Sequence, residues 1–117
     1  MVTNFESITH ELTVDEIGMI KPLCKSLMRY KKENPITAKE IIQKWNNSGL
    51  SLPKISEPRL RKLVNYIRTN KLLPIIADSN GYYVASSNEE IQENVRGLIE
   101  RANGILAAAK GLSEIII

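Results

Sequence analysis

Apolar residues recur every three or four positions in four stretches of the chain, and a helix-start signal precedes each stretch. The segments 13–16, 37–40 and 87–90 each begin with Thr or Ser and have Glu three residues later, which is the capping-box pattern. In a capping box, the hydroxyl and the carboxylate each satisfy a free backbone N–H group at the helix start. The fourth helix start is at Ser56, whose hydroxyl can cap the helix. Pro58 then falls in the first turn, where the N–H group that proline lacks would have no partner in the helix. The pattern therefore predicts four helices.

The first predicted helix starts at Thr13 and has an apolar stripe along one side. The stripe consists of Ile17, Ile20, Cys24, Leu27 and Met28. Pro22 has no N–H to donate to residue 18, so we expect a kink or a break between residues 18 and 22. Because the residue before a proline disfavours helical backbone, we expect Pro35 to end this helix near residue 34.

The second predicted helix starts at Thr37 and is short, with about ten residues. Ile36 before the cap and Ile41 four residues after it form the pair of a hydrophobic staple. Ile41, Ile42 and Trp45 form its buried face. Gly49 is free to adopt positive φ and ends the helix.

The third predicted helix begins at Ser56 and has two different faces. The inward face is apolar and consists of Leu60, Leu63, Val64 and Ile67. At about 100° per residue, the opposite face holds Lys62, Asn65 and Thr69, flanked by Arg61, Arg68 and Tyr66, with Arg59 near the start. This outward face is rich in hydrogen-bond donors and has no carboxylate.

Residues 72–84 have a strand pattern. Two short β-prone runs flank the turn residues Ser79, Asn80 and Gly81, which predicts an antiparallel hairpin. Tyr82 and Tyr83 face opposite sides of a strand, so we expect one to be buried and the other to be partly exposed.

The last predicted helix carries a heptad pattern of apolar residues. The seam consists of Ile91, Val95, Leu98, Ala102, Ile105, Ala109 and Leu112. A helix of about 24 residues is about 36 Å long, which exceeds what a core of this size can cover. We therefore favour a homodimer through this helix, in a parallel, antiparallel or bundle-like arrangement. Packing against its own domain and binding to a different partner are the alternatives.

Composition limits the class of protein. The 117 residues, of which 43% are hydrophobic and 25% charged, fit one small globular domain at residues 1–86 and a dimerisation helix at 87–117. This length excludes a large multidomain enzyme. Apolar runs such as 105–109 are far shorter than the roughly 18 residues of a membrane span, so we expect no membrane association and a cytoplasmic location. The single cysteine agrees with a reducing compartment.

The positive charge is concentrated in the middle of the chain. Residues 21–71 contain thirteen Lys and Arg against three Glu, a net charge of +10, whereas residues 1–20 carry −4 and residues 72–117 carry −3. The whole chain has a formal charge of only +3. A basic middle between acidic ends indicates a surface that binds a polyanion.

The order of three helices and a hairpin, with a basic third helix, resembles the winged-helix DNA-binding domain over residues 13–86. The third helix ending Tyr66-Ile-Arg-Thr-Asn70, followed by a hairpin ending Gly81-Tyr-Tyr83, is similar to helix-turn-helix proteins encoded by phages and prophages. The resemblance implies a mainly α-helical fold with a small β-hairpin, namely a winged helix-turn-helix plus a long C-terminal helix. It also implies sequence-specific binding of double-stranded DNA in phage or prophage transcription regulation or replication. The link at 48–55 is longer than the usual turn of about 3–4 residues.

A helix fits into the major groove of DNA, where Arg, Lys and Asn side chains form hydrogen bonds with base edges. We predict the DNA-binding residues from this geometry. Arg61, Lys62 and Asn65 are the candidates for base edges, with Tyr66 and Thr69 beside them. Lys39, Lys44, Lys54, Arg59 and Arg68 are the candidates for phosphates. Ser79 and Asn80 at the hairpin tip contact a minor groove or a phosphate, or form only a tight turn.

Other function classes have weaker support in the sequence. The main alternative to DNA binding is a protein interaction module that uses the basic face for an acidic partner protein. Single-stranded nucleic acid ranks last, because it requires aromatic platforms and only 5% of the residues are aromatic. We expect no catalytic residue, metal or cofactor, since His10 and Cys24 have no zinc-site spacing and no phosphate-binding glycine motif is present.

Overall fold

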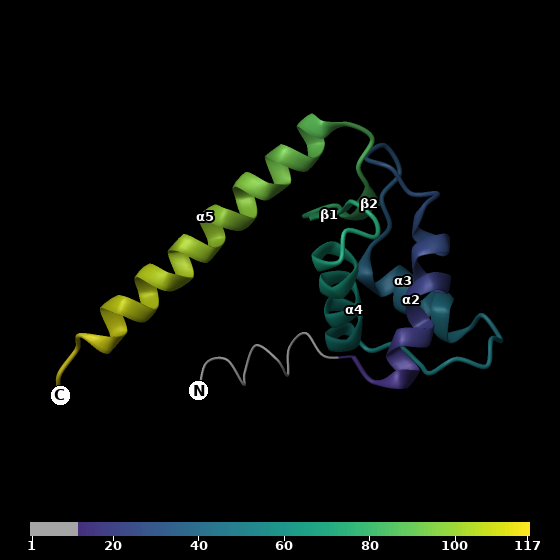
Figure 1. The fold of residues 1–117 in the computed structure, drawn as a ribbon, viewed down its shortest axis with the longest axis horizontal. Helices are drawn as coiled ribbons and strands as arrows, with labels where there is room; N and C mark the ends of the chain where they lie inside the picture. Colours follow the sequence, from purple (N-terminus) through teal and green to yellow (C-terminus); the bar gives the residue numbers. More distant parts are fainter. Residues whose placement is uncertain (1–11) are drawn as a thin grey trace. The chain divides into compact units, whose positions relative to one another are not determined.

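The helices begin where the capping residues place them. In the computed structural model, which describes residues 12–117, α2 spans Val14–Leu27, α3 spans Ala38–Asn46 and α4 spans Glu57–Thr69 (Figure 1). The hydroxyls of Thr13, Thr37 and Ser56 each accept a hydrogen bond from the backbone N–H three residues later. The predicted starts of these three helices are confirmed. His10 lies outside the described residues.

The buried face of α2 differs from the predicted stripe. The structure buries Glu16, Met19, Ile20, Leu23 and Leu27. Ile17 and Met28, which the stripe included, are 54% and 56% exposed. The prediction is wrong at these two positions because a pattern of apolar residues leaves out Glu16, which lies on the inner face. Cys24 is half-buried against the core, and burial raises the pKa of its thiol.

The predicted end near residue 34 is also wrong, and of the kink or break predicted at Pro22, the break does not occur. Pro22 lies inside a continuous α2, which ends at Leu27. Met19 and Leu23, on either side of Pro22, are both fully buried in one core, so packing outweighs the loss of one backbone hydrogen bond. Beyond α2, the side chain of Asn34 accepts a hydrogen bond from the N–H of Lys31 and closes a separate turn.

The α4 helix packs against α2, α3 and β1 and so forms the centre of the domain (Figure 1). Leu60, Leu63 and Ile67 of α4 are fully buried, and Val64 is 2% exposed. The predicted apolar face of this helix is therefore confirmed. The staple residues Ile36 and Ile41 belong to the same core.

The predicted hairpin is confirmed. Strand β1 spans Ile75–Asp78 and pairs antiparallel with β2, Gly81–Val84, through the turn residues 79 and 80. An isolated bridge fastens the hairpin to the segment before α3, because Ile36 and Tyr82 exchange backbone hydrogen bonds of 2.9 and 2.7 Å. Tyr83 is buried and Tyr82 is half-buried, as the strand alternation predicts.

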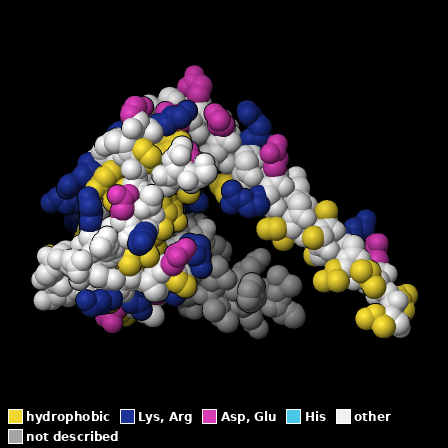
Figure 2. Space-filling view, turned by 180° about the vertical axis from the view of Figure 1, so that it is seen from behind, with side chains coloured by type: hydrophobic (Ala, Val, Ile, Leu, Met, Phe, Trp, Pro, Cys, Tyr) yellow, Lys and Arg dark blue, Asp and Glu magenta, His cyan; other side chains and the backbone are white. Residues whose placement is uncertain are grey.

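The last helix, α5, spans Asn88–Ser113 and begins at the predicted cap, Ser87. The chain divides into two units between Ser86 and Ser87. Within α5, large apolar side chains gather along its length (Figure 2). They include Val95, Leu98, Ile99, Ile105, Leu106 and Leu112. None of the helices in residues 12–117 has the length and apolar content that a membrane crossing requires.

Replacing Gly81 tests the bridge between the hairpin and the helices. Gly81 has φ of 128°, and a Cβ there would lie 2.5 Å from the carbonyl oxygen of Ile36. We expect Gly81→Ala to lower the free energy of unfolding by about 3 kcal/mol, since strained backbone and steric overlap add. Urea unfolding measures the change.

The matched control is Gly49→Ala. Gly49 also has a positive φ, of 80°, but a Cβ there would meet nothing within 4 Å. We expect this substitution to cost only about 1 kcal/mol, the backbone contribution alone. An equal loss of unfolding free energy in the two variants would mean that the close approach of Gly81 to Ile36 does not contribute to the cost of Gly81→Ala.

Candidate nucleic-acid interface

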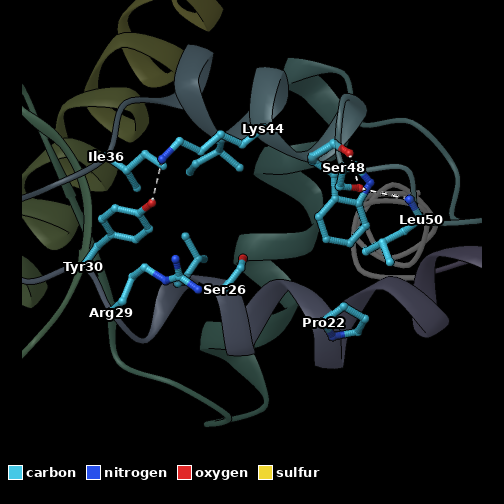
Figure 3. A pocket seen from close by; sticks show the side chains of 11 residues that line it. Pro22, Ser26, Arg29, Tyr30, Ile36, Lys44, Ser48 and Leu50 are labelled. Carbon is cyan, nitrogen blue, oxygen red and sulfur yellow. Dashed lines mark hydrogen bonds between the residues drawn. The ribbon is translucent and has the colours of Figure 1, made fainter.

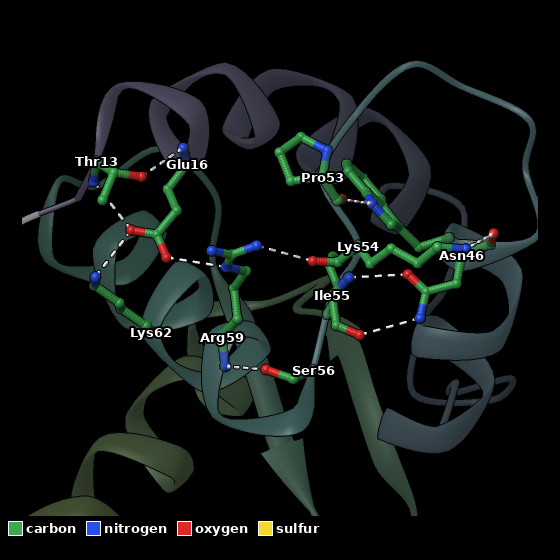
Figure 4. A network of polar contacts seen from close by, with 10 residues as sticks. Thr13, Glu16, Asn46, Pro53, Lys54, Ile55, Ser56, Arg59 and Lys62 are labelled. Carbon is green, nitrogen blue, oxygen red and sulfur yellow. Dashed lines mark hydrogen bonds and ion pairs between the residues drawn. The ribbon is translucent and has the colours of Figure 1, made fainter.

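The Glu16 carboxylate joins α2 to α4 through two ion pairs, and it also accepts one hydrogen bond from the cap of its own helix (Figure 4). Its Oε1 accepts from the N–H of Thr13 at 3.0 Å and from Nζ of Lys62 at 2.9 Å. Its Oε2 accepts from Nε of Arg59 at 3.1 Å. The same residue thus caps its own helix and binds two cations of α4.

Glu16 is ionised over nearly the whole pH range. Burial on its own would raise the pKa of this carboxyl, but the hydrogen bond and charge of Lys62, the N–H of Thr13 and the guanidinium of Arg59 outweigh burial. Together they lower the pKa of Glu16 from 4.5 to about 2. The carboxylate therefore stabilises the fold fully above pH 4.5, and this contribution is lost as pH falls toward 2.

Two predicted DNA contacts, Arg59 and Lys62, face α2 because of this arrangement. The side chains of Arg59 and Lys62 are only 34% and 29% exposed. Nη1 of Arg59 also donates to the carbonyl of Lys54 at 3.0 Å. These two cations position α4 within the domain, and they are not on its outward side.

Two other residues of the predicted face also have contacts inside the domain. Nε of Arg68 donates to the carbonyl oxygen of Ile75 at 2.9 Å, which ties α4 to the first strand of the hairpin. Tyr66 packs against the core. Both side chains are half-buried.

The outward side of α4 includes Glu57 as well as Arg61, Asn65 and Thr69, so the prediction that this face has no carboxylate is wrong. Arg61 and Thr69 are exposed and Asn65 is half-buried. Nη1 of Arg61 lies 3.4 Å from the carboxylate of Glu57, and both side chains of this pair are at least 60% exposed. An exposed pair of this kind contributes about 0–1 kcal/mol, so Arg61 can exchange Glu57 for another anion.

The predicted phosphate contacts outside α4 are exposed but differ in their neighbours. Lys39 lies in the first turn of α3. Nζ of Lys54 donates to the carbonyl of Asn46 at 3.4 Å. Nζ of Lys44 donates to the hydroxyl of Tyr30 at 3.2 Å and lies 5.7 Å from the centroid of that ring.

The hairpin tip offers little to an anion. Ser79 and Asn80 are exposed, as a contact with DNA requires. However, the backbone N–H of Asn80 donates to Oδ1 of Asp78 at 2.8 Å. This N–H group therefore already has an acceptor, and that acceptor is negatively charged.

Side chains of α3 fix the end of the long link between α3 and α4 (Figure 4). The amide of Asn46 accepts from the N–H of Ile55 at 2.9 Å and donates to its carbonyl at 3.1 Å. Nε1 of Trp45 donates to the carbonyl of Pro53 at 2.9 Å. The link therefore has a defined end although it contains ten residues, 47–56.

Sequence reasoning missed the structural roles of Glu16 and Asn46. Glu16 could have been found from its spacing, because positions 16, 19, 20, 23 and 27 share one helix face. A carboxylate on an inward face requires a cationic partner, and α4 is rich in cations. Asn46 gave no such signal, since its partners depend on the path of the link.

Comparisons with known proteins assign no family to the chain. No family model matches it, and no solved structure matches it significantly. A stretch of 96 residues is 25% identical to Midasin of Dictyostelium discoideum. The match covers 82% of this chain, but the chain spans only 2% of the length of Midasin. The described residues contain no cluster of His, Cys, Asp and Glu that could hold a metal ion.

Replacing Glu16 tests its connection to α4. We expect Glu16→Gln to lower the free energy of unfolding at pH 7 by about 2–3 kcal/mol, because two partly buried cations lose their counter-charge. The difference between the two proteins should shrink as pH falls from 4.5 toward 2, where the native carboxyl also becomes neutral. Urea unfolding at a series of pH values measures it.

Glu57→Gln is the matched control, because it makes the same substitution in an exposed ion pair of α4. We expect it to change the free energy of unfolding by less than about 0.5 kcal/mol. A difference for Glu16→Gln that stays constant between pH 7 and pH 2 would contradict the role given to its charge.

Proposed function

We propose that residues 13–86 bind double-stranded DNA as a winged-helix domain, with the outward side of α4 in the major groove. The observation that carries this proposal is the position of Arg61, Asn65 and Thr69 on the outward side of a helix whose other side is the core. Arg and Asn are the side chains that bond guanine and adenine in pairs of hydrogen bonds. The hairpin follows α4 directly, as in a winged helix.

The cations of this domain divide into two groups. Arg59, Lys62 and Arg68 hold α4 against α2 and the hairpin. Lys39 and Lys54, which are exposed, contact phosphates and set the position of the protein on the duplex. The hairpin tip contributes little, because Asp78 repels phosphate there.

The α5 helix pairs with a second copy of the chain. A single helix cannot cover its own apolar side, and the seam residues of α5 recur at heptad spacing over its length. A two-fold pair presents two copies of α4 to two half-sites on DNA, in phage or prophage transcription regulation or replication.

Replacing Arg61 tests the contact with DNA. We expect Arg61→Ala to weaken binding to a selected duplex about tenfold, because one bidentate base contact contributes about 1–3 kcal/mol. Duplexes selected from a random pool supply the site, and fluorescence anisotropy over a salt series measures affinity. Arg61 is exposed, so the variant should unfold at the urea concentration of the parent protein.

Lys110→Ala is the control, since it removes one charge from α5 and none from the domain. It should leave the affinity unchanged. No DNA binding at low salt, or binding without salt dependence, would rule out the proposed function. Capture of an acidic protein in place of DNA would favour the alternative, a protein interaction module.

A charge within the seam of α5 tests the homodimer. We expect Ile105→Glu to convert the dimer to a monomer, since pairing would bury an uncompensated carboxylate. Ala107→Glu, about 200° further around the helix, places the same charge away from the seam and should leave the dimer intact. Sedimentation velocity gives the mass. A monomeric parent protein at high concentration would contradict pairing.

A further inference from the structure

A cavity of about 340 Å³ lies between α2 and α3, and none of its described lining residues belongs to α4. Pro22, Ser26 and Leu27 of α2 form one wall and Ile41, Lys44 and Trp45 of α3 form another. Its volume is within the range of about 300–1,000 Å³ that small-molecule sites have.

The two ends of the cavity differ in chemistry (Figure 3). Arg29, Tyr30 and Lys44 lie at one end, and Pro22 and Leu50 lie at the other. No Asp or Glu is among the described lining residues. Glu40, one turn before Lys44 in α3, interacts electrostatically with Lys44. The cavity therefore combines positive charge with an apolar body.

The groups at the cationic end are available to a ligand. The guanidinium of Arg29 is exposed and has no hydrogen bond or ion pair with any residue in the range 12–117. Lys44 uses one of its donors on the Tyr30 hydroxyl, which holds its ammonium at this end of the cavity. An ammonium has three donors, so two remain for an anion.

We propose that this cavity binds a small amphipathic carboxylate, whose carboxylate lies between Arg29 and Lys44 and whose apolar body lies against Trp45 and Leu50. A free phosphate would satisfy the cations but would leave the apolar walls uncovered. A neutral apolar molecule would cover the walls but would leave the cations without a partner. Only a ligand that combines both properties matches the whole cavity.

The site is independent of the proposed DNA contacts. Its walls come from α2, α3 and the segments that follow them, and the outward side of α4 takes no part. Binding of a carboxylate is measured on the full chain without DNA. A failure of this proposal therefore leaves the proposed function untouched, and the reverse also holds.

The chain supplies its own reporter, because Trp45 is the only tryptophan and lines the cavity. The probe is cyclohexanecarboxylate, which does not absorb where indole does, and its uncharged amide is the comparison. We expect the carboxylate to change indole emission saturably with a Kd on the order of 1 mM. The amide should bind about tenfold more weakly, because it cannot form charge-assisted bonds with Arg29 and Lys44.

Arg29→Gln and Lys44→Gln should each lower affinity for the carboxylate about fivefold or more and leave affinity for the amide unchanged. Lys25→Gln is the matched control, since Lys25 is an exposed cation of α2 that does not line the cavity. Urea unfolding of each variant shows that the fold is retained.

Four results would overturn the proposal. The first is an emission that neither probe changes, and the second is equal binding of carboxylate and amide. The third is an emission that changes with protein concentration alone, in the Ile105→Glu variant as well as in the parent protein, which would show that a second copy of the chain fills the cavity. Retention of full carboxylate affinity by both Gln variants would likewise place the anion elsewhere.

Discussion

The carboxylate of Glu16 determines how α4 is oriented in this domain. It lies in the first turn of α2, and it accepts from the N–H of its own cap and from Arg59 and Lys62, which are 43 and 46 residues away in the chain. Arg59 and Lys62 are three positions apart in the helix, so both lie on one flank of α4. Fixing this flank against α2 also fixes which residues of α4 face outward.

An ion pair of this kind specifies an arrangement more than it adds stability. Removing charges from water costs free energy that their attraction only partly recovers, whereas leaving one partner alone is strongly unfavourable. A rotation of α4 about its axis would separate Glu16 from its cations and would expose part of the apolar face. Packing and charge therefore favour the same orientation, and Arg68 adds a third constraint at the other end of α4 through the carbonyl of Ile75.

The sequence predicted those parts of the fold that depend on neighbouring residues. The caps at Thr13, Thr37 and Ser56, the apolar face of α4 and the hairpin are all local patterns, and the structure contains them. The stripe of α2 was predicted in the wrong register because the spacing was read from apolar residues alone, and Glu16 belongs to that face. The roles of Lys62 and Arg68 could not be predicted, since a helical projection shows which way a side chain points but not what lies opposite.

The same limit applies to the candidate sites. A count of charges located the basic region, but it could not separate cations that hold the domain together from those that are available to a ligand. That separation depends on single contacts, such as the one between Lys62 and Glu16 or the one between Lys44 and Tyr30. The cavity between α2 and α3 had no sequence signal, because its walls come from two helices and two loops.

The hydrogen bonds between Asn46 and Ile55 determine which contacts would remain if a protease cut the link between α3 and α4. Between Ser48 and Leu52 the link includes exposed residues, among them Gly49 and Leu50, which a protease can reach. Trp45 and Asn46 hold the far end of the link through Pro53 and Ile55, and both halves share one core. A cut after Gly49 would therefore remove none of these hydrogen bonds and no residue of the shared core.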